Sequence, residues 1–392
     1  MLFEQTTPTI PAKSNLYYPA LTGIRAFAAY LVFFHHFNPF TNESWPERLV
    51  REGHIGVTVF FVLSGFLITT RYLDKTRLSV DWLKGYFQNR IARIYPLYFL
   101  LTCVTFLVLL KDPTYDILQQ WQKLIISDKA LIVFLNLTFL RGFFNTFLFT
   151  AIQQGWTLTV EETFYAFAVP LMLVLNLVRG KKQYGVLAVA ALGFVGVGCA
   201  LVYVNPVHRY GFFSPATFMF YRTFFGRAVE FMMGAALALF VRHHSTLRKG
   251  AWATAVGGLW MVACLGALAC IATKESPSYQ NSLGLVVNNL VLPLGISILF
   301  YGLLTERTQL AHLLSTKVAQ TLGKSSYAFY LVHLGILSVY IQRNISESPV
   351  VIFAMALGVA YLLWRFIEEP LQTRLRSKPN HQKKKPLLVS AA

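Results

Sequence analysis

Apolar stretches long enough to cross a lipid bilayer follow one another along almost all of this chain of 392 residues. A helix needs about 20 predominantly apolar residues to span the hydrocarbon core, where every backbone polar group must be satisfied internally. The sequence therefore predicts an all-α integral membrane protein of ten transmembrane helices, at residues 21–40, 55–70, 91–110, 156–178, 184–204, 218–241, 251–272, 283–304, 322–340 and 350–367.

The composition excludes an ordinary soluble domain, because 55% of the residues are hydrophobic and only 13% are charged. The four cysteines lie inside apolar stretches, without paired loop spacing and without neighbouring histidines. They predict neither a disulfide framework nor a metal site. We expect them to be small buried side chains.

The net charge of +18 is explained by topology. With ten spans both termini lie on one side, and the loops and termini of that side hold 22 Lys and Arg against nine on the other. By the positive-inside rule both termini are cytoplasmic, and no nucleic acid is needed to explain the charge. We expect a cytoplasmic segment at 1–16, a transmembrane domain at 17–370 and a basic cytoplasmic tail at 371–392.

Two segments between the predicted spans have mixed character. Residues 78–89 combine polar and aromatic side chains and are expected to lie along the cytoplasmic interface before the third span. Residues 131–140, within the longest external connection, form an apolar run that is too short to cross the bilayer. A re-entrant or interfacial segment is the prediction there.

The first apolar stretch carries ionisable side chains, which are costly in lipid and usually functional. Arg25 and His36 are eleven residues apart, which is close to three helical turns, so both project from one helix face about 16 Å apart. Arg25 then lies toward the cytoplasm and His36 toward the outside. Depth estimates place Glu161 in the layer of His36, with His333 facing the same cavity.

This combination suits acyl transfer from a thioester donor to a hydroxyl group. A histidine can take the proton of an attacking alcohol, and the carboxylate of Glu161 can orient its imidazole. The guanidinium of Arg25 suits the phosphates of a donor, because it is always charged and binds oxygen pairs. Arg227 and Glu230, spaced i and i+3, can pair on one helix face.

Several segments in order resemble the membrane-bound acyltransferase family 3, whose members move acyl groups, often acetyl from acetyl-CoA, to carbohydrate and other acceptors. The resemblance covers nearly the whole chain and implies a multi-pass protein of the cell membrane, in bacteria the inner membrane. The first helix has the family's spacing of a basic residue, ten residues and a histidine. The remaining similar segments are GHIGVTVFFVLSGFLIT, RIARIYPLY, WTLTVEETFY, GRAVEFMMG and SSYAFYLVH.

The resemblance implies His36 and Glu161 as catalytic residues. It implies donor binding by Arg25, Arg90 and Arg93, with acetyl-CoA as a substrate and no permanently bound cofactor. Thr157 stands where the family usually has serine, which keeps the hydroxyl group. No fused hydrolase-like domain is expected, so the chain looks like a stand-alone transferase. Further residues that line the cavity or hold the helices are Ser64, Trp156, Arg227, Glu230, Tyr330 and His333.

Structural explanations compete with each of these roles. His36 could belong to an interfacial aromatic belt, Arg25 could snorkel to the interface, and Glu161 could stabilise a helix N-terminus. A transporter or flippase is the alternative function, and a lipid or an antibiotic is the alternative to a carbohydrate acceptor. The sequence leaves open whether transfer is direct or passes through an acyl-enzyme intermediate, and it does not determine the oligomeric state.

Overall fold

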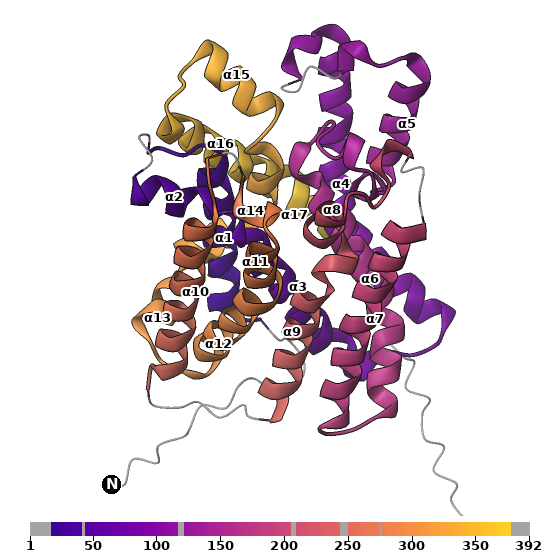
Figure 1. The fold of residues 1–392 in the computed structure, drawn as a ribbon, viewed down its shortest axis with the longest axis vertical. Helices are drawn as coiled ribbons and strands as arrows, with labels where there is room; N and C mark the ends of the chain where they lie inside the picture. Colours follow the sequence, from indigo (N-terminus) through magenta and orange to yellow (C-terminus); the bar gives the residue numbers. More distant parts are fainter. Residues whose placement is uncertain are drawn as a thin grey trace, which may run out of the picture.

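The computed structural model describes residues 17–40, 44–116, 121–204, 209–243, 250–274 and 276–377. The described residues form helices and turns and no β-strand, which confirms the all-α prediction. The predicted segment 1–16 and the tail beyond residue 377 lie outside the described residues. The α-helices shown in Figure 1 are Pro19–His36 (α1), Trp45–Arg51 (α2), Ile55–Tyr72 (α3), Val80–Lys111 (α4), Ile126–Leu137 (α5), Trp156–Leu177 (α6), Lys182–Val204 (α7), Ala216–Arg222 (α8), Phe224–His243 (α9), Trp252–Ile271 (α10), Ser282–Val286 (α11), Leu292–Thr305 (α12), Gln309–Leu314 (α13), Lys317–Val332 (α14), Ile336–Asn344 (α15), Pro349–Leu363 (α16) and Glu369–Leu375 (α17).

Eight helical segments of the described chain are long and apolar enough to cross a membrane, where the sequence predicts ten spans. The two predicted spans outside this set correspond to α1 and α14. These helices pack lengthwise against each other, and α1 also packs against α3. A helix that is surrounded by protein can carry polar residues on the faces that meet its neighbours. Both helices carry candidate site residues, among them Arg25 and His36 on α1 and Tyr330 on α14.

Small residues let the central helices approach closely. A side chain at Gly65 of α3 would run into the carbonyl oxygen of Phe231 on α9, and one at Gly234 of α9 would meet the carbonyl oxygen of Val62. Glycine at such positions permits backbone contact between helices in a membrane. These two close approaches hold α9 against α3.

The prediction of one continuous span at 322–340 is wrong. Helix α14 ends at Val332, Gly335 has a φ of 112°, and α15 begins at Ile336. A positive φ is incompatible with a right-handed helix and is accessible to glycine. His333 is consequently the residue that follows the last turn of α14, and α15 turns away at the top of the bundle (Figure 1).

A second difference concerns the segment 78–89. It is not a separate interfacial piece, because α4 runs without interruption from Val80 to Lys111 and is 32 residues long. Polar residues mark where a helix leaves the apolar region, but they do not end it. The apolar run at 131–140 lies mostly in α5, a 12-residue helix beside the upper end of α4 (Figure 1).

Candidate active site

Two neighbouring cavities lie inside the bundle and share Val57 and Tyr330 as wall residues. The first, here the arginine cavity, has a volume of about 60 Å³ and is lined by Arg25, Ser64, Arg93, Glu161 and Tyr327 among others. The second, here the histidine cavity, has a volume of about 400 Å³ and is lined by His35, His36, His54, Trp156 and Arg222 among others.

Helix α1 contributes to both cavities. Arg25 lines the arginine cavity and His36, the last residue of α1, lines the histidine cavity. Three turns of one helix separate them, so the two side chains point in the same direction at different depths. The sequence-based prediction of a basic residue and a titratable residue on one face of this helix is confirmed in its geometry.

Two guanidinium groups converge on the arginine cavity. Arg25 of α1 and Arg93 of α4 both line it, and neither forms a hydrogen bond or an ion pair with any residue that the structure describes. The charges that act on Arg25 are those of Arg93, Glu368 and Glu161. The carboxylate of Glu161 lines the same space but bonds to neither arginine, so the N–H groups of both guanidiniums are available to a bound anion. The contribution of Glu368, from the π-helical turn before α17, is not evident in the sequence.

Arg90, one turn before Arg93, is not part of this cavity wall. Its Nη2 donates to the hydroxyl of Tyr72 at 3.0 Å, and its guanidinium stacks on the rings of Tyr72 and Tyr165 at 5.3 and 5.5 Å. The side chain is 4% exposed. Arg90 is therefore held among aromatic rings, and the structure does not bring it to the space that Arg25 faces.

Glu161 lies in the arginine cavity and not with His36. Its Oε1 accepts hydrogen bonds from Ser64 Oγ at 2.7 Å and from the hydroxyl of Tyr165. The expectation that Glu161 shares the layer of His36 is wrong, because only the first residues of α6 reach the histidine cavity. Trp156 lines that cavity, and Glu161 lies about 7.5 Å further along the helix.

A hydrogen-bonded partition separates the two cavities. The hydroxyl groups of Tyr330 on α14 and Thr157 on α6 lie 3.1 Å apart. Gln154 donates through Nε2 to the carbonyl oxygens of Tyr330 and Leu331, both at 2.7 Å. Thr157 in turn donates to the carbonyl oxygen of Gln154 at 2.9 Å. Tyr330 is thus both a wall residue and the link between α14 and α6.

His36 is the accessible member of a histidine cluster. Its ring centroid lies 4.7 Å from that of His35 and 5.6 Å from that of His333. His35 is engaged through Nδ1 with the carbonyl oxygen of Arg51, and His333, fully buried, is engaged with that of Tyr330 at 2.8 Å. The imidazole of His36 is exposed to the cavity and bonds to no described residue. Its ring nitrogens are therefore available to accept a proton from a bound molecule.

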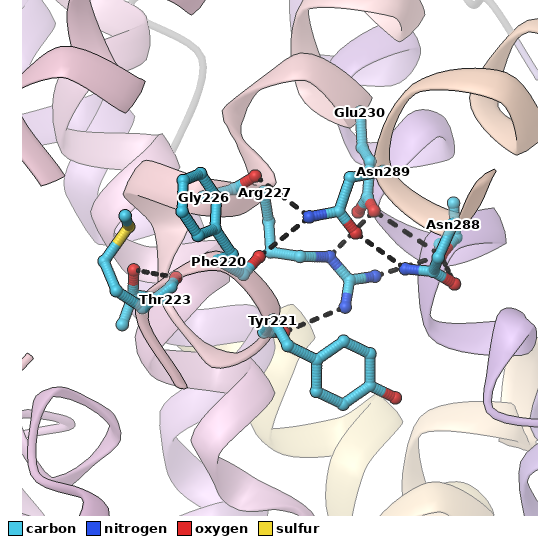
Figure 2. A network of polar contacts seen from close by, with 10 residues as sticks. Phe220, Tyr221, Thr223, Gly226, Arg227, Glu230, Asn288 and Asn289 are labelled. Carbon is cyan, nitrogen blue, oxygen red and sulfur yellow. Dashed lines mark hydrogen bonds and ion pairs between the residues drawn. The ribbon is translucent and has the colours of Figure 1, made fainter. Parts of the chain in front are cut away.

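The predicted pair of Arg227 and Glu230 is confirmed as a buried ion pair outside both cavities, with Arg227 Nε 2.7 Å from Glu230 Oε1. Figure 2 shows that it belongs to a larger network with asparagines of the π-helical turn between α11 and α12. Arg227 also donates to Thr58 Oγ1 and to the carbonyl oxygen of Tyr221, both at 3.0 Å. This network joins α3, α8 and α9.

The histidine cavity has further residues that the sequence does not indicate as site residues. Tyr221 ends α8 with Arg222, and Tyr279 belongs to the connection before α11; their rings stack at 4.2 Å. Gln153 and Gln154 come from the turn before α6. Tyrosines and glutamines in connections have no characteristic spacing, so nothing in the sequence separates them from ordinary loop residues.

The structure is a helical bundle with a histidine at the end of its first span and with arginines that face an inner cavity. The sequence of this chain is also similar to sequences of known proteins. A family model described as an acyltransferase domain matches residues 18–365. The chain therefore belongs to this acyltransferase family. The sequence motifs had already indicated that the chain resembles an acyltransferase family.

The curated relatives have low sequence identity to this chain, but the similarity extends over most of its length. "Putative O-acetyltransferase SACOL0978" of Staphylococcus aureus (strain COL) is 24% identical over 383 residues, which is 92% of this chain and 58% of the relative. O-acetyltransferase OatA of Staphylococcus aureus (strain NCTC 8325 / PS 47) is 25% identical over 382 residues, with the same coverage. The chain thus spans less than two thirds of the length of these relatives. No solved structure matches.

Proposed function

We propose that this protein is a membrane O-acyltransferase that moves an acetyl group from acetyl-CoA to a hydroxyl group of a carbohydrate acceptor. The observation that carries the proposal is the placement of Arg25 and His36 on one face of α1, in two cavities that share a wall. Membership of the acyltransferase family and the names of the curated relatives agree with this reaction.

The arginine cavity suits the donor. Coenzyme A carries several phosphate oxygens, and guanidinium groups bind such oxygens in pairs. Arg25 and Arg93 offer ten N–H donors between them, counting five for each arginine, and are not bonded to other residues of the described chain. The cavity of about 60 Å³ is too small for the whole coenzyme, so part of the donor lies outside it. The partition at Tyr330 and Thr157 must open for the acetyl group to reach His36.

The histidine cavity suits the acceptor. His36 accepts the proton of the acceptor hydroxyl group. At the same time the hydroxyl oxygen attacks the carbonyl carbon of the thioester, and a new C–O bond forms. The C–S bond then breaks and the sulfur leaves as the thiol with the proton from the imidazolium. An acyl-enzyme route would need an additional nucleophile and would use the same base.

In the sided arrangement we propose, the arginine cavity is reached from the cytoplasm and the histidine cavity from the outside of the bacterial membrane. The greater number of basic residues on the terminal side supports this orientation. The donor is then available where it is made, and the acceptor is modified where envelope carbohydrates are exposed. The oligomeric state does not enter this proposal.

The test is acetyl transfer by purified protein in lipid nanodiscs, with radiolabelled acetyl-CoA and a panel of oligosaccharides. His36→Ala should lower the rate of transfer by about 10²- to 10⁴-fold, the usual contribution of a general base. His312→Ala, an exposed histidine on α13, is the matched control and should keep full activity. Unchanged transfer by His36→Ala would remove the central assignment. Uptake of an oligosaccharide into sealed proteoliposomes, without release of CoA, would support the transporter instead.

A further inference from the structure

Arg222 occupies an unusual place in the histidine cavity. It is the last residue of α8, and its guanidinium carbon lies near the centroids of four aromatic rings that belong to three separate parts of the chain. The distances are 4.5 Å to Tyr221, 4.6 Å to Trp156, 5.3 Å to Phe149 and 5.4 Å to Tyr279. The aromatic faces stabilise the cation and shield it from water on several sides.

The positive charge of Arg222 has no bonded anion. Arg222 forms no hydrogen bond or ion pair with the part of the chain that the structure describes, and no Asp or Glu lines the histidine cavity. Glu52, which lies next to the cavity residue His54, is occupied: it accepts a hydrogen bond from Ser278 and lies 3.5 Å from Nδ1 of His54. Five N–H donors of a partly desolvated guanidinium therefore lie beside the cavity without a protein acceptor.

The backbone that carries Arg222 is held from behind by the buried network of Figure 2. Arg227 donates to the carbonyl oxygen of Tyr221, and Asn289 donates to that of Phe220 at 2.8 Å. Thr223, in an extended conformation, separates α8 from α9. The position of Arg222 is thus fixed by fully buried residues, which is the support that a specific binding site requires.

We propose that Arg222 binds an anionic group, a carboxylate or a phosphate, that is carried by the acceptor sugar, so that the acceptor class is acidic carbohydrate. The proposal rests on the proposed function, in which the histidine cavity receives the acceptor. His36 lines the same cavity, so one residue would take the hydroxyl proton while the other fixes the ring that carries the hydroxyl. A planar guanidinium binds both oxygens of a carboxylate and thereby sets the orientation of the sugar.

Binding measurements test this directly, because they do not depend on turnover. The ligands are β-1,4-linked tetrasaccharides of glucuronic acid and of glucose, which differ only at C6, together with glucose 6-phosphate and glucose as the phosphate pair. Dissociation constants are measured by calorimetry on the full chain in nanodiscs. The proteins compared are the wild type, Arg222→Gln, Arg222→Lys and the control Arg48→Gln, an arginine that stacks on Trp45 outside the cavity.

The wild type and Arg48→Gln should bind at least one acidic ligand at least tenfold more tightly than its neutral partner, since a hydrogen bond to a charged group contributes that much. Arg222→Gln should remove the preference and leave acetyl-CoA binding unchanged. Arg222→Lys should keep part of the preference for acidic ligands, because lysine keeps the positive charge but lacks the planar guanidinium that binds two oxygens at once.

Equal affinity for the acidic and neutral ligands in the wild type would overturn the proposal, as would a preference that survives Arg222→Gln. In the acetyl-transfer assay, an equal loss with acidic and neutral acceptors in Arg222→Gln would assign Arg222 to the reaction itself and also contradict the proposal. A preserved binding preference without any acetyl transfer would instead contradict the proposed function and leave acid recognition standing.

Discussion

At the scale of single residues, Arg90 and Arg93 have different environments in the structure, although the sequence motif assigns both the same role. Arg90 and Arg93 lie three residues apart on α4 and belong to the same motif. Arg93 lines the arginine cavity, whereas Arg90 donates to Tyr72 and stacks on two tyrosine rings. Their substitution should therefore have different consequences.

Arg93→Gln should raise the KM for acetyl-CoA by about tenfold or more, because it removes a charged contact to a donor phosphate worth ~1.5–3 kcal/mol. Arg90→Gln should instead lower the thermal midpoint, since it breaks a buried hydrogen bond and two cation–π contacts. Steady-state kinetics and thermal unfolding in nanodiscs measure both effects. The account fails if Arg93→Gln leaves the donor KM unchanged while Arg90→Gln raises it without loss of stability.

The residues also show what sequence reasoning can reach. Arg25 and His36 lie on one helix, so helix periodicity alone relates them, and their placement agrees with the structure. Glu161 and His36 lie on different helices, and their relative depth depends on how α6 is offset against α1. Helix α6 is positioned through α14, which packs against α1, by contacts such as Tyr330 with Thr157, and no local pattern encodes these contacts.

At the scale of elements, hydropathy locates helices better than it locates their ends and breaks. The stretch at 322–340 is predominantly apolar, yet Gly335 divides it, because a backbone angle decides whether a helix continues. The polar segment at 78–89 gives the opposite case, since α4 continues through it. The positions of most spans could be predicted because they depend on the preference of apolar side chains for lipid over water, and the composition of each segment shows this preference.

One element boundary offers a test of stability against pH. Glu306, directly after α12, accepts hydrogen bonds from the amides of Ala253 and Thr254 at 2.9 Å and from Thr254 Oγ1 at 2.7 Å, at the start of α10. Burial raises the pKa of Glu306, but these hydrogen bonds together lower the pKa by more than burial raises it. The pKa of Glu306 in the folded protein therefore lies below its usual value of 4.5. The folded protein therefore holds this carboxylate charged more strongly than the unfolded chain does.

A lowered folded pKa gives stability that is present above pH 4.5 and is lost as the pH falls through the folded pKa. Glu306→Gln should lower the free energy of unfolding by about 1–3 kcal/mol at pH 7, the cost of leaving buried donors poorly satisfied. The deficit relative to the wild type should shrink below pH 4. Denaturant unfolding in mixed micelles at pH 7 and at pH 3.5 measures it, and a deficit that grows on acidification would contradict the assignment.

At the scale of the whole molecule, the two cavities lie end to end and meet at Tyr330 and Val57. One end offers cations without bonded partners, and the other offers an accessible imidazole beside aromatic rings. Family membership and motif order could be inferred from the sequence over nearly the whole chain. The partition between the cavities and the aromatic surround of Arg222 could not, because both are assembled from helices and connections far apart in sequence.

The most direct measurement is a structure of the protein with acetyl-CoA bound, determined by electron cryomicroscopy in nanodiscs. Our account predicts donor phosphates on Arg25 and Arg93, a displaced Tyr330 side chain, and the thioester carbon in the histidine cavity within reach of a hydroxyl on His36. Phosphates of acetyl-CoA bound in the histidine cavity, or a thioester held away from His36 behind an intact contact between Tyr330 and Thr157, would contradict it.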